Sequence, residues 1–474
     1  YSWCCHAYTF GGASVECRAA TGIFRRRHRL LHGPCGVIDM GAATGTQRQR
    51  ARRAVIGSIA GNALEWYDFF LFSAAAALVF NKLFFPAADP AVASLAALSV
   101  YAVGFVARPV GGLLFGHIGD RFGRKTSLIW TLSIMGVATF AMGLLPTYAQ
   151  IGWWAPALLV ILRLAQGLAA GGEWGGGVLM ITENAPAHRR GFFGAWSQAG
   201  VGLGFVVSSL AFFLVRQLPD TDFYSWGWRL PFLGSVVIFI AGVFIRKRVA
   251  ETALPVGDSA HAALPIVTLL RSYPRTLLLG IGARLGENGG SQMLITFSLV
   301  YGASVGAATD VMLVGIMLGM IADSAMMPVF GAISDRLGRR PVYMVGLVAM
   351  ALFAYPFLQM LESGSTSLII LALVIGNGIC HAAMIGVQPA LYSEMFEGEV
   401  RYSGLAFVHE VAAVIVGMVP LLSAALFARY VSPEPVALYL GAICLISLIS
   451  VALTKETRPK GRHSDFPPPA PATR

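Results

Sequence analysis

The sequence predicts an all-α integral membrane protein with twelve transmembrane helices in two six-helix halves. Composition is the first observation that predicts this fold: 56% of the 474 residues are hydrophobic, 12% are charged, and the mean hydropathy is +0.67. A soluble domain of this length is more polar, so most of this chain is expected to contact lipid. The second observation is a ten-residue motif that occurs at 116–125 and again at 331–340, each time between long apolar segments. Such a repeat indicates two related halves.

The twelve helices follow from apolar runs of about 20 residues, the length that crosses the hydrocarbon core of a bilayer. The predicted crossings are 55–80, 94–117, 127–146, 157–182, 191–215, 229–247, 276–303, 310–333, 341–361, 367–392, 402–428 and 435–454. This division gives an N-terminal six-helix half at 40–247, a linker at 248–275 and a C-terminal six-helix half at 276–454. The proline-rich end at 455–474 is expected to be a disordered tail.

The formal net charge of +11 does not indicate nucleic-acid binding, because the cations recur in alternate loops rather than in one patch. The loops on one side carry Arg48, Arg50, Arg52, Arg53, Arg121, Arg124, Lys125, Arg189, Arg190, Arg246, Lys247, Arg248, Arg336, Arg339, Arg340, Lys455 and Arg458. The loops on the other side carry little beyond Lys82 and Arg429 among cations. By the positive-inside rule the first side is cytoplasmic. Both termini are then cytoplasmic, and the protein is expected to be a multi-pass protein of the cell (inner) membrane.

Residues 1–39 differ from the rest of the chain. They begin with Tyr1 and hold four of the six cysteines. We expect a non-native or disordered extension, with Met40 as the natural start. A secretory signal would need an uninterrupted apolar segment before a small-residue cleavage site, and none of the required length is present. A metal-binding tail is disfavoured because the cysteine spacing fits no zinc pattern, and no metal or other cofactor is expected.

The linker holds one segment, 263–270, that can lie amphipathically on the membrane surface. The linker is too short for a separate catalytic domain. Function is therefore expected to depend on polar groups inside the helices, because an ionisable side chain at bilayer depth is costly and persists where it is paired or useful. The ionisable groups within the predicted helices are Glu65, Asp68, Arg108, Arg163, Glu173, Arg284, Glu287, Asp323, His409 and Glu410.

The first helix places two carboxylates, Glu65 and Asp68, on one face, because residues three apart in a helix lie close together. Neighbouring carboxylates in a low dielectric hinder each other's ionisation, so that one of them can carry a proton near neutral pH. Both are candidate proton-coupling residues. The alternative for Glu65 is that it only caps or pairs near the cytoplasmic end of its helix.

The fourth helix carries Arg163 and then a glycine-rich run with Glu173 in it. A guanidinium keeps its proton, so Arg163 needs a carboxylate partner within the bundle. The run at 171–177 is not a phosphate-binding loop, since it lacks the Gly-Lys-Ser/Thr ending of that motif. It favours close packing of helices, as do Gly200 and Gly204 in the fifth helix. Packing leaves Glu173 unexplained, and it is a candidate substrate or proton group.

The seventh helix carries Arg284, Glu287 and Asn288, a cation, an acid and an amide close together, where an anionic substrate can dock. The alternative is an internal salt bridge between Arg284 and Glu287. His409 in the eleventh helix is a further candidate substrate residue, although a single buried histidine is more often structural. Arg163 completes the candidate substrate-binding set.

The two motif copies, G-H-I-G-D-R-F-G-R-K at 116–125 and G-A-I-S-D-R-L-G-R-R at 331–340, resemble the loop signature of the major facilitator superfamily. The alternative is an ordinary basic loop. The segment 163–171 resembles the fourth-helix signature of that superfamily. In its proton symporters this resemblance implies an ion pair between the arginine, Arg163, and an acid of the first helix, Asp68.

Four further segments, 61–70, 105–112, 171–176 and 225–232, resemble the metabolite:proton symporter family, which carries shikimate, 2-oxoglutarate, citrate, and proline or glycine betaine. The segments 387–396 and 401–404 look most like the shikimate-carrier branch. The chain shows two departures from superfamily patterns. The tenth helix has no arginine matching Arg163, so the two halves have diverged there. The fifth helix lacks the G-P-x-x-G-G block of drug:proton antiporters, and this absence favours symport.

The resemblance implies alternating access, in which the two halves rock around a central site and the repeated loops act as gates. The implied gating residues are Gly116, Asp120, Arg121, Gly123, Arg124, Asp335, Arg336 and Arg339. The expected function is proton-coupled import of a small organic acid by a carrier that needs no cofactor, with a monomer favoured. The alternatives are an osmolyte symporter and a non-transporting nutrient sensor. An intramembrane enzyme is disfavoured, because no nucleophile with its base and no metal-spaced histidine cluster is found.

Overall fold

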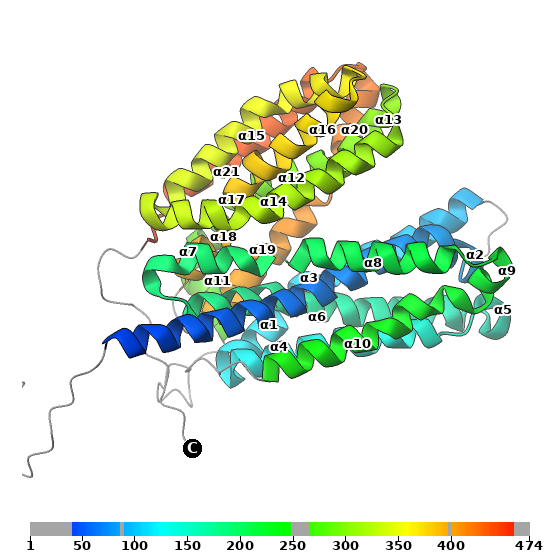
Figure 1. Ribbon diagram of the computed structural model, residues 1–474, viewed down its shortest axis with the longest axis horizontal. Coiled ribbons are helices and arrows are strands. Elements are labelled where there is room, and N and C mark those ends of the chain that lie inside the picture. Colours follow the sequence, from blue (N-terminus) through cyan, green and yellow to red (C-terminus); the bar gives the residue numbers. More distant parts are fainter. Residues whose placement is uncertain (1–39, 86–89, 199, 248–264, 397–399, 459–474) are drawn as a thin grey trace, which may run out of the picture.

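The computed structural model describes residues 40–85, 90–198, 200–247, 265–396 and 400–458, and within them it contains helices, turns and no strand (Figure 1). The expected extension at 1–39, most of the linker and most of the tail lie outside these residues. So does part of the segment 263–270, whose described remainder belongs to α11 (Pro265–Ser272).

The N-terminal bundle is formed by six long helical segments, several of them built from more than one element. They are α1 (Met40–Ala75) with η1 (Ala76–Phe80) and α2 (Asn81–Leu83); α3 (Pro90–Phe122); α4 (Arg124–Leu144); α5 (Tyr148–Ile151) and α6 (Trp154–Asn184); η2 (Ala187–Arg189), α7 (Arg190–Ala195), η3 (Trp196–Gln198) and α8 (Gly200–Arg216); and α9 (Asp220–Asp222), η4 (Phe223–Gly227) and α10 (Arg229–Lys247).

The C-terminal bundle, which follows α11, has the same plan. Its segments are α12 (Pro274–Gln292), η5 (Met293–Phe297) and α13 (Ser298–Ser304); α14 (Thr309–Leu337); α15 (Arg339–Glu362); α16 (Thr366–Ile375), η6 (Gly376–His381), α17 (Ala382–Ile385) and α18 (Gln388–Met395); α19 (Arg401–Val416) and α20 (Val419–Tyr430); and α21 (Glu434–Leu453).

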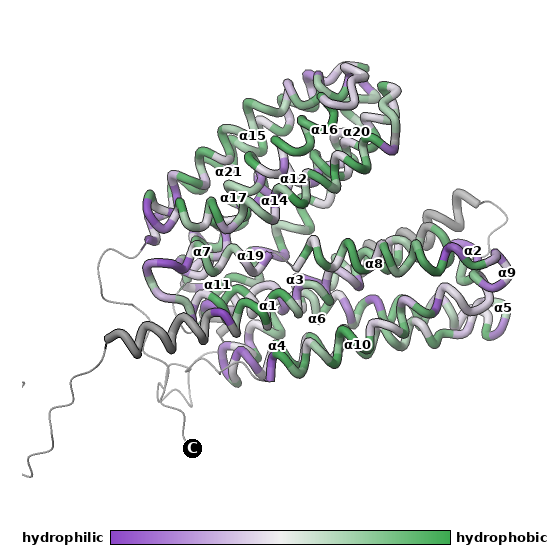
Figure 2. Tube along the Cα trace, in the orientation of Figure 1, coloured by the Kyte–Doolittle hydropathy of each residue, from purple (hydrophilic) through white to green (hydrophobic). Residues whose placement is uncertain are grey.

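Ten helical segments among the described residues are long and apolar enough to cross a membrane. The two other predicted crossings, 94–117 and 276–303, coincide with α3 and with the run from α12 to α13. Side chains such as Val106, Val237 and Leu352 are about 70% exposed, which suits contact with lipid rather than with water. Figure 2 shows hydrophobic residues along the middle of both bundles and hydrophilic ones gathered at their ends. The predicted twelve-helix, all-α membrane fold is confirmed.

The helices of the N-terminal bundle approach closely where glycines face each other. A Cβ atom added at Gly171 of α6 would lie 2.0 Å from the Arg108 carbonyl oxygen of α3, and one added at Gly111 would lie 1.9 Å from the Leu168 carbonyl oxygen. Gly200 and Gly204 of α8 face the backbone of α1 in the same way. The predicted close packing is therefore confirmed, and it is the packing that small residues permit in membranes.

The two bundles meet at one end of the molecule, which we name the basic end because Arg124, Lys125, Arg189, Arg339 and Arg340 lie there. Figure 1 shows the bundles joined near α7, α18 and α19 and separating toward α9 and α13, at what we name the opposite end. The contacts between halves join α3 and α6 to α19, and α7 to α14 and α18.

Candidate functional site

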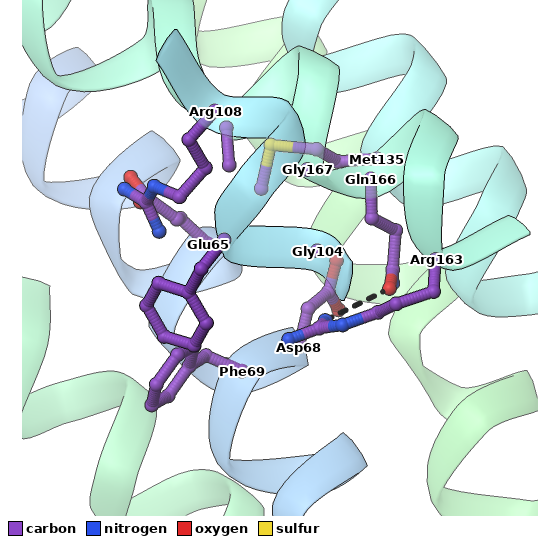
Figure 3. A pocket seen from close by; sticks show the side chains of 11 residues that line it. Glu65, Asp68, Phe69, Gly104, Arg108, Met135, Arg163, Gln166 and Gly167 are labelled. Carbon is purple, nitrogen blue, oxygen red and sulfur yellow. Dashed lines mark hydrogen bonds and ion pairs between the residues drawn. The ribbon is translucent and has the colours of Figure 1, made fainter. Parts of the chain in front are cut away.

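A pocket in the N-terminal half lies among α1, α3, α4 and α6, with an empty volume of about 340 Å³ that includes space open to solvent. It is lined by Glu65, Asp68, Phe69, Gly104, Phe105, Arg108, Met135, Arg163, Gln166, Gly167 and Ala170 (Figure 3). The prediction that Glu65 and Asp68 lie on one face of their helix is confirmed, and both side chains line this pocket.

Asp68 and Arg163 are linked through two uncharged side chains. The Thr139 hydroxyl donates to Asp68 Oδ2 at 2.6 Å, and Gln166 Nε2 donates to that hydroxyl oxygen at 2.7 Å. Arg163 Nη1 in turn donates to Gln166 Oε1 at 3.1 Å, and the guanidinium lies 4.4 Å from the centre of the Phe72 ring. Sequence reasoning missed Thr139, because a threonine in an apolar run gives no charge signal.

Arg108 joins the two halves of the protein. Its Nη2 donates to Glu65 Oε1 at 2.6 Å, within the N-terminal half, and its Nε donates to Glu410 Oε2 of α19 at 2.7 Å. Glu410 is fully buried. Glu65 is therefore paired, as its alternative role predicted. Its partner, Arg108, lines the pocket and does not lie at the cytoplasmic end of a helix. Arg108 was recognised in the sequence only as a buried cation.

His409 continues this line of contacts into the C-terminal half. Its Nδ1 lies 2.8 Å from Glu410 Oε1, and its ring stacks on Trp174 with ring centres 3.7 Å apart. Trp174 belongs to α6 of the N-terminal half, yet its side chain packs in the hydrophobic core formed mainly by the C-terminal half. The predicted substrate residue His409 thus lies at the interface between the halves.

Glu173 is held by Arg246, which contacts both of its carboxylate oxygens, and by the Thr131 hydroxyl at 2.9 Å. Arg246 lies within the predicted crossing 229–247, as the penultimate residue of α10, but counting it among the cations of a basic loop is wrong, because it is fully buried. Its Nη1 also donates to the Leu128 carbonyl oxygen at 2.8 Å. The sequence did not indicate the pairing of Arg246 with Glu173, because Arg246 is followed directly by Lys247 and Arg248. Three consecutive cations are typical of a basic loop.

In the C-terminal half Gln388 separates Arg284 from Glu287. Arg284 Nη1 donates to Gln388 Oε1 at 3.1 Å, and Gln388 Nε2 donates to Glu287 Oε2 at 2.7 Å. Within the described residues no ion pair joins Arg284 to Glu287, so the expected alternative of a direct salt bridge is wrong. Arg284 lies 5.7 Å from the Trp174 ring centre. Asn288 is partly exposed and does not line the pocket described above.

The aspartate of each motif copy binds the start of a helix in the other half. Asp120 accepts from the backbone N–H groups of Tyr402 (3.1 Å) and Ser403 (2.9 Å) at the start of α19. Asp335 accepts from those of Gly191 (2.8 Å) and Phe192 (2.9 Å) at the start of α7. A carboxylate is favourable there because helix N-termini carry unpaired N–H groups and partial positive charge.

The other residues of the motif shape and support these contacts. Arg124 pairs with Glu183 and lies 3.8 Å from Asp120, and Arg339 pairs with Asp335 at 2.7 Å. Gly123 has a φ of 107°, which only glycine adopts readily, so α4 can begin directly after α3. At Gly116 a Cβ atom would lie 2.6 Å from the Ser403 Cα. The side chains of Arg121 and Arg336 are exposed at the basic end.

The repeat also relates two charged residues inside the bundles. Arg108 stands eight residues before Gly116 in α3, and Asp323 stands eight residues before Gly331 in α14. The two halves therefore place charges of opposite sign at equivalent positions.

Comparison with known proteins gives a consistent result. Residues 54–254 match the family described as "Sugar (and other) transporter", and residues 313–473 match "Major Facilitator Superfamily". The chain is 39% identical over 419 residues to the shikimate transporter of Escherichia coli (strain K12), covering 86% of this chain and 95% of the relative. It is 34% identical over 428 residues to the proline/betaine transporter of the same strain, covering 86% and 84%.

Among solved structures, the proton:xylose symporter XylE bound to 6-bromo-6-deoxy-D-glucose has a similar fold. The TM-score is 0.69 at 17% identity, covering 87% of this chain and 97% of that one. The fold, the duplicated motif and the relatives agree. The chain is a multi-pass membrane protein and belongs to the major facilitator superfamily of transporters.

Proposed function

We propose that this protein is a proton-coupled symporter that imports a small organic acid, such as shikimate or a related carboxylate, across the inner membrane. One observation carries the proposal: a single pocket inside the N-terminal half holds two carboxylates, Glu65 and Asp68, and two guanidinium groups, Arg108 and Arg163. Such a set offers both a proton acceptor and an anion-binding group at bilayer depth. The 39% identity to a shikimate transporter supports the choice of substrate class.

Arg163 is the group that we assign to the substrate carboxylate. A guanidinium presents a planar fork of N–H donors that matches a carboxylate, and it stays charged throughout the cycle. Phe69, Phe105 and Met135 supply an apolar wall of the same pocket, against which a carbon ring can pack. Arg284, Glu287, Asn288 and His409 are proposed to contact the substrate from the C-terminal half, and Glu173 remains a candidate.

Asp68 is the group that we assign to the proton. While Asp68 is ionised, its negative charge and that of a substrate carboxylate compete for the same guanidinium. A proton on Asp68 removes this competition, so proton and substrate bind best together. That mutual dependence is the coupling, because each ligand raises the affinity for the other by the same factor.

The orientation follows from the positive-inside rule, which places the basic end in the cytoplasm together with both termini. In this orientation the contacts of Asp120 and Asp335 close the cytoplasmic end, and the Arg108–Glu410 pair holds the two halves together beside the pocket. The bundles separate toward the outside, where substrate enters. Rocking of the halves breaks these contacts and opens the cytoplasmic end.

A zwitterionic osmolyte is the second candidate substrate, since relatives 34% identical are named proline/betaine transporters. Its carboxylate would bind Arg163 in the same way. Its cationic group would face aromatic rings, and Phe69 and Phe105 lie edge to face in this pocket with centres 5.2 Å apart.

Uptake of radiolabelled shikimate into vesicles with a controlled pH gradient tests the proposal, with unlabelled organic acids and betaine as competitors. We expect gradient-driven accumulation that organic acids block and betaine does not. Asp68→Asn should abolish accumulation but retain exchange of internal for external shikimate, whereas Asp310→Asn, at an exposed position, should behave as wild type. Competition by betaine alone would show that the protein is instead an osmolyte symporter. Binding of shikimate without its accumulation would indicate a non-transporting sensor.

A further inference from the structure

A second group of buried ionisable residues lies in the C-terminal half, away from the pocket of Figure 3. His381 of η6 stands between two carboxylates: its Nδ1 is 3.0 Å from Asp323 Oδ2 of α14, and its Nε2 is 3.1 Å from Glu287 Oε1 of α12. The three residues are 6%, 2% and 3% exposed. Both ring nitrogens thus face acceptors, an arrangement that a doubly protonated imidazolium satisfies completely and a neutral imidazole only in part.

The surroundings of His381 supply one further charge. Arg284 of α12 reaches the cluster through Gln388, which also donates to the Tyr343 hydroxyl of α15 at 3.3 Å. Tyr392 of α18 donates its hydroxyl to the Gly280 carbonyl oxygen. The described parts of α16 and α17, which also pack against η6, contain no ionisable side chain. The charged groups in contact with His381 are therefore Asp323 and Glu287, and Arg284 is linked to Glu287 through Gln388.

The charges of this cluster balance only when it holds a proton. Two carboxylates, Asp323 and Glu287, face one guanidinium, Arg284, so an uncompensated negative charge remains while His381 is neutral. An unbalanced charge in a low-dielectric interior costs several kcal/mol. A proton on His381 removes that cost.

The N-terminal cluster has the same deficit. Glu65, Asp68 and Glu410 are three carboxylates, and Arg108 and Arg163 are two guanidinium groups. That cluster also reaches neutrality with one proton. The two halves together then hold two.

Three features of the site favour exchange of its proton rather than permanent retention. His381 ends a π-helical segment, a wide turn that is frequent at functional sites. Asp323 Oδ1 is buried and has no hydrogen-bond partner among the described residues, so it is available as an acceptor. The cluster is also connected, through Gln388 and Arg284, to Trp174 of the opposite half. Rocking of the halves therefore changes its surroundings.

We propose that His381, held between Asp323 and Glu287, is a second proton-binding site and that the carrier moves two protons with each substrate monoanion. The coupling part of this inference rests on the proposed function; the presence of the proton does not. One net positive charge then enters per cycle. With His381 removed, one proton accompanies the anion and the cycle becomes electroneutral.

The bound proton is tested without substrate, by NMR of the full-length carrier labelled with ¹⁵N-histidine in lipid nanodiscs. His381→Gln assigns the signal, and His188→Gln, at an exposed position, is the matched control. We expect an imidazolium signal from His381 at neutral pH, with its loss in Asp323→Asn. A neutral imidazole at this position in the wild type would overturn the proposal.

The coupling is tested in vesicles at equal internal and external pH, with a potassium diffusion potential, inside negative, and radiolabelled shikimate as the probe. With one net charge per cycle, accumulation changes about tenfold for each 59 mV imposed. We expect this response in wild type and in His188→Gln. His381→Gln should lose it while retaining uptake driven by a pH gradient, which also shows that the variant is folded.

A wild type driven by the pH gradient but indifferent to the potential would refute the second transported proton, as would a potential response retained in His381→Gln. Absence of uptake of shikimate and of every other organic acid tested would instead refute the proposed function. The NMR result alone then decides whether His381 holds a proton.

Discussion

Replacing Glu410 by glutamine should shift the protein away from the conformation described here. Glu410 is, among the described residues of the C-terminal half, the one acid bound to Arg108, with contacts at 2.7 and 3.4 Å. The rocking of the halves proposed above would break this pair, since its members lie on α3 and α19. Glutamine keeps the shape and can accept one hydrogen bond, but it lacks the charge.

The size of the shift follows from the bonds that remain. Arg108 keeps its bond to Glu65, so the guanidinium is not left without a counter-charge. The loss is therefore that of a hydrogen bond between charged groups, about 1.5–3 kcal/mol, rather than that of a stranded buried ion. Since about 1.4 kcal/mol is a factor of ten in an equilibrium constant, the population should move about 10- to 150-fold toward the state open at the basic end.

Distances between spin labels measure this equilibrium. Labels at Leu214 of α8 and Leu313 of α14, both exposed, report on the opposite end; labels at Arg189 and Leu337 report on the basic end. In Glu410→Gln the first distance should shorten and the second should lengthen.

The matched control is Glu65→Gln. It removes a bond of similar length, 2.6 Å, from the same guanidinium, but this bond lies within one half and does not change when the halves rock. We expect distance distributions close to wild type. Unchanged distances in Glu410→Gln, or an equal shift in both variants, would refute the assignment of this pair as a contact between moving halves.

Three further predictions follow from the packing and the buried charges. Gly111→Ala should lower the melting temperature of the solubilised protein, because its Cβ would lie 1.9 Å from a carbonyl oxygen at a cost of about 1–3 kcal/mol; Gly234→Ala, with nothing within 4 Å, should not. Glu173→Gln should destabilise the protein by about 3–5 kcal/mol in denaturant unfolding, because it leaves Arg246 buried without a counter-charge, and Arg246→Met in the same chain should restore much of the loss. Asp335→Asn should weaken binding at the start of α7 by about 1 kcal/mol and lengthen the label distance at the basic end; no change there would argue against a gate.

The sequence predicted the fold because its signals are local. Apolar runs of bilayer length and a repeated turn motif do not depend on how distant segments pack. The twelve crossings, and the equivalent turns at Gly123 and Gly338, could therefore be predicted from the sequence. The shared face of Glu65 and Asp68 also followed from helical geometry alone.

The partners of the buried charges were much harder to predict, because they depend on tertiary packing. Arg246 finds Glu173 across 73 residues, and Arg108 finds Glu410 across 302. Thr139 and Gln388 mediate contacts between charged groups, but uncharged polar residues in apolar helices give no signal that separates them from packing residues. The list of ionisable residues therefore identified the buried charges that need partners, but it did not identify those partners.

The opposite charges at the equivalent positions of the repeat, Arg108 and Asp323, bear on how such a protein can arise. A dimer of identical six-helix units would carry the same residue at both positions, and two like charges in one low-dielectric interior repel each other. A duplicated gene on one chain escapes this constraint, because each copy can change independently. The fused chain can thus keep a cation in one copy and a carboxylate in the other, a division of labour closed to a symmetric ancestor.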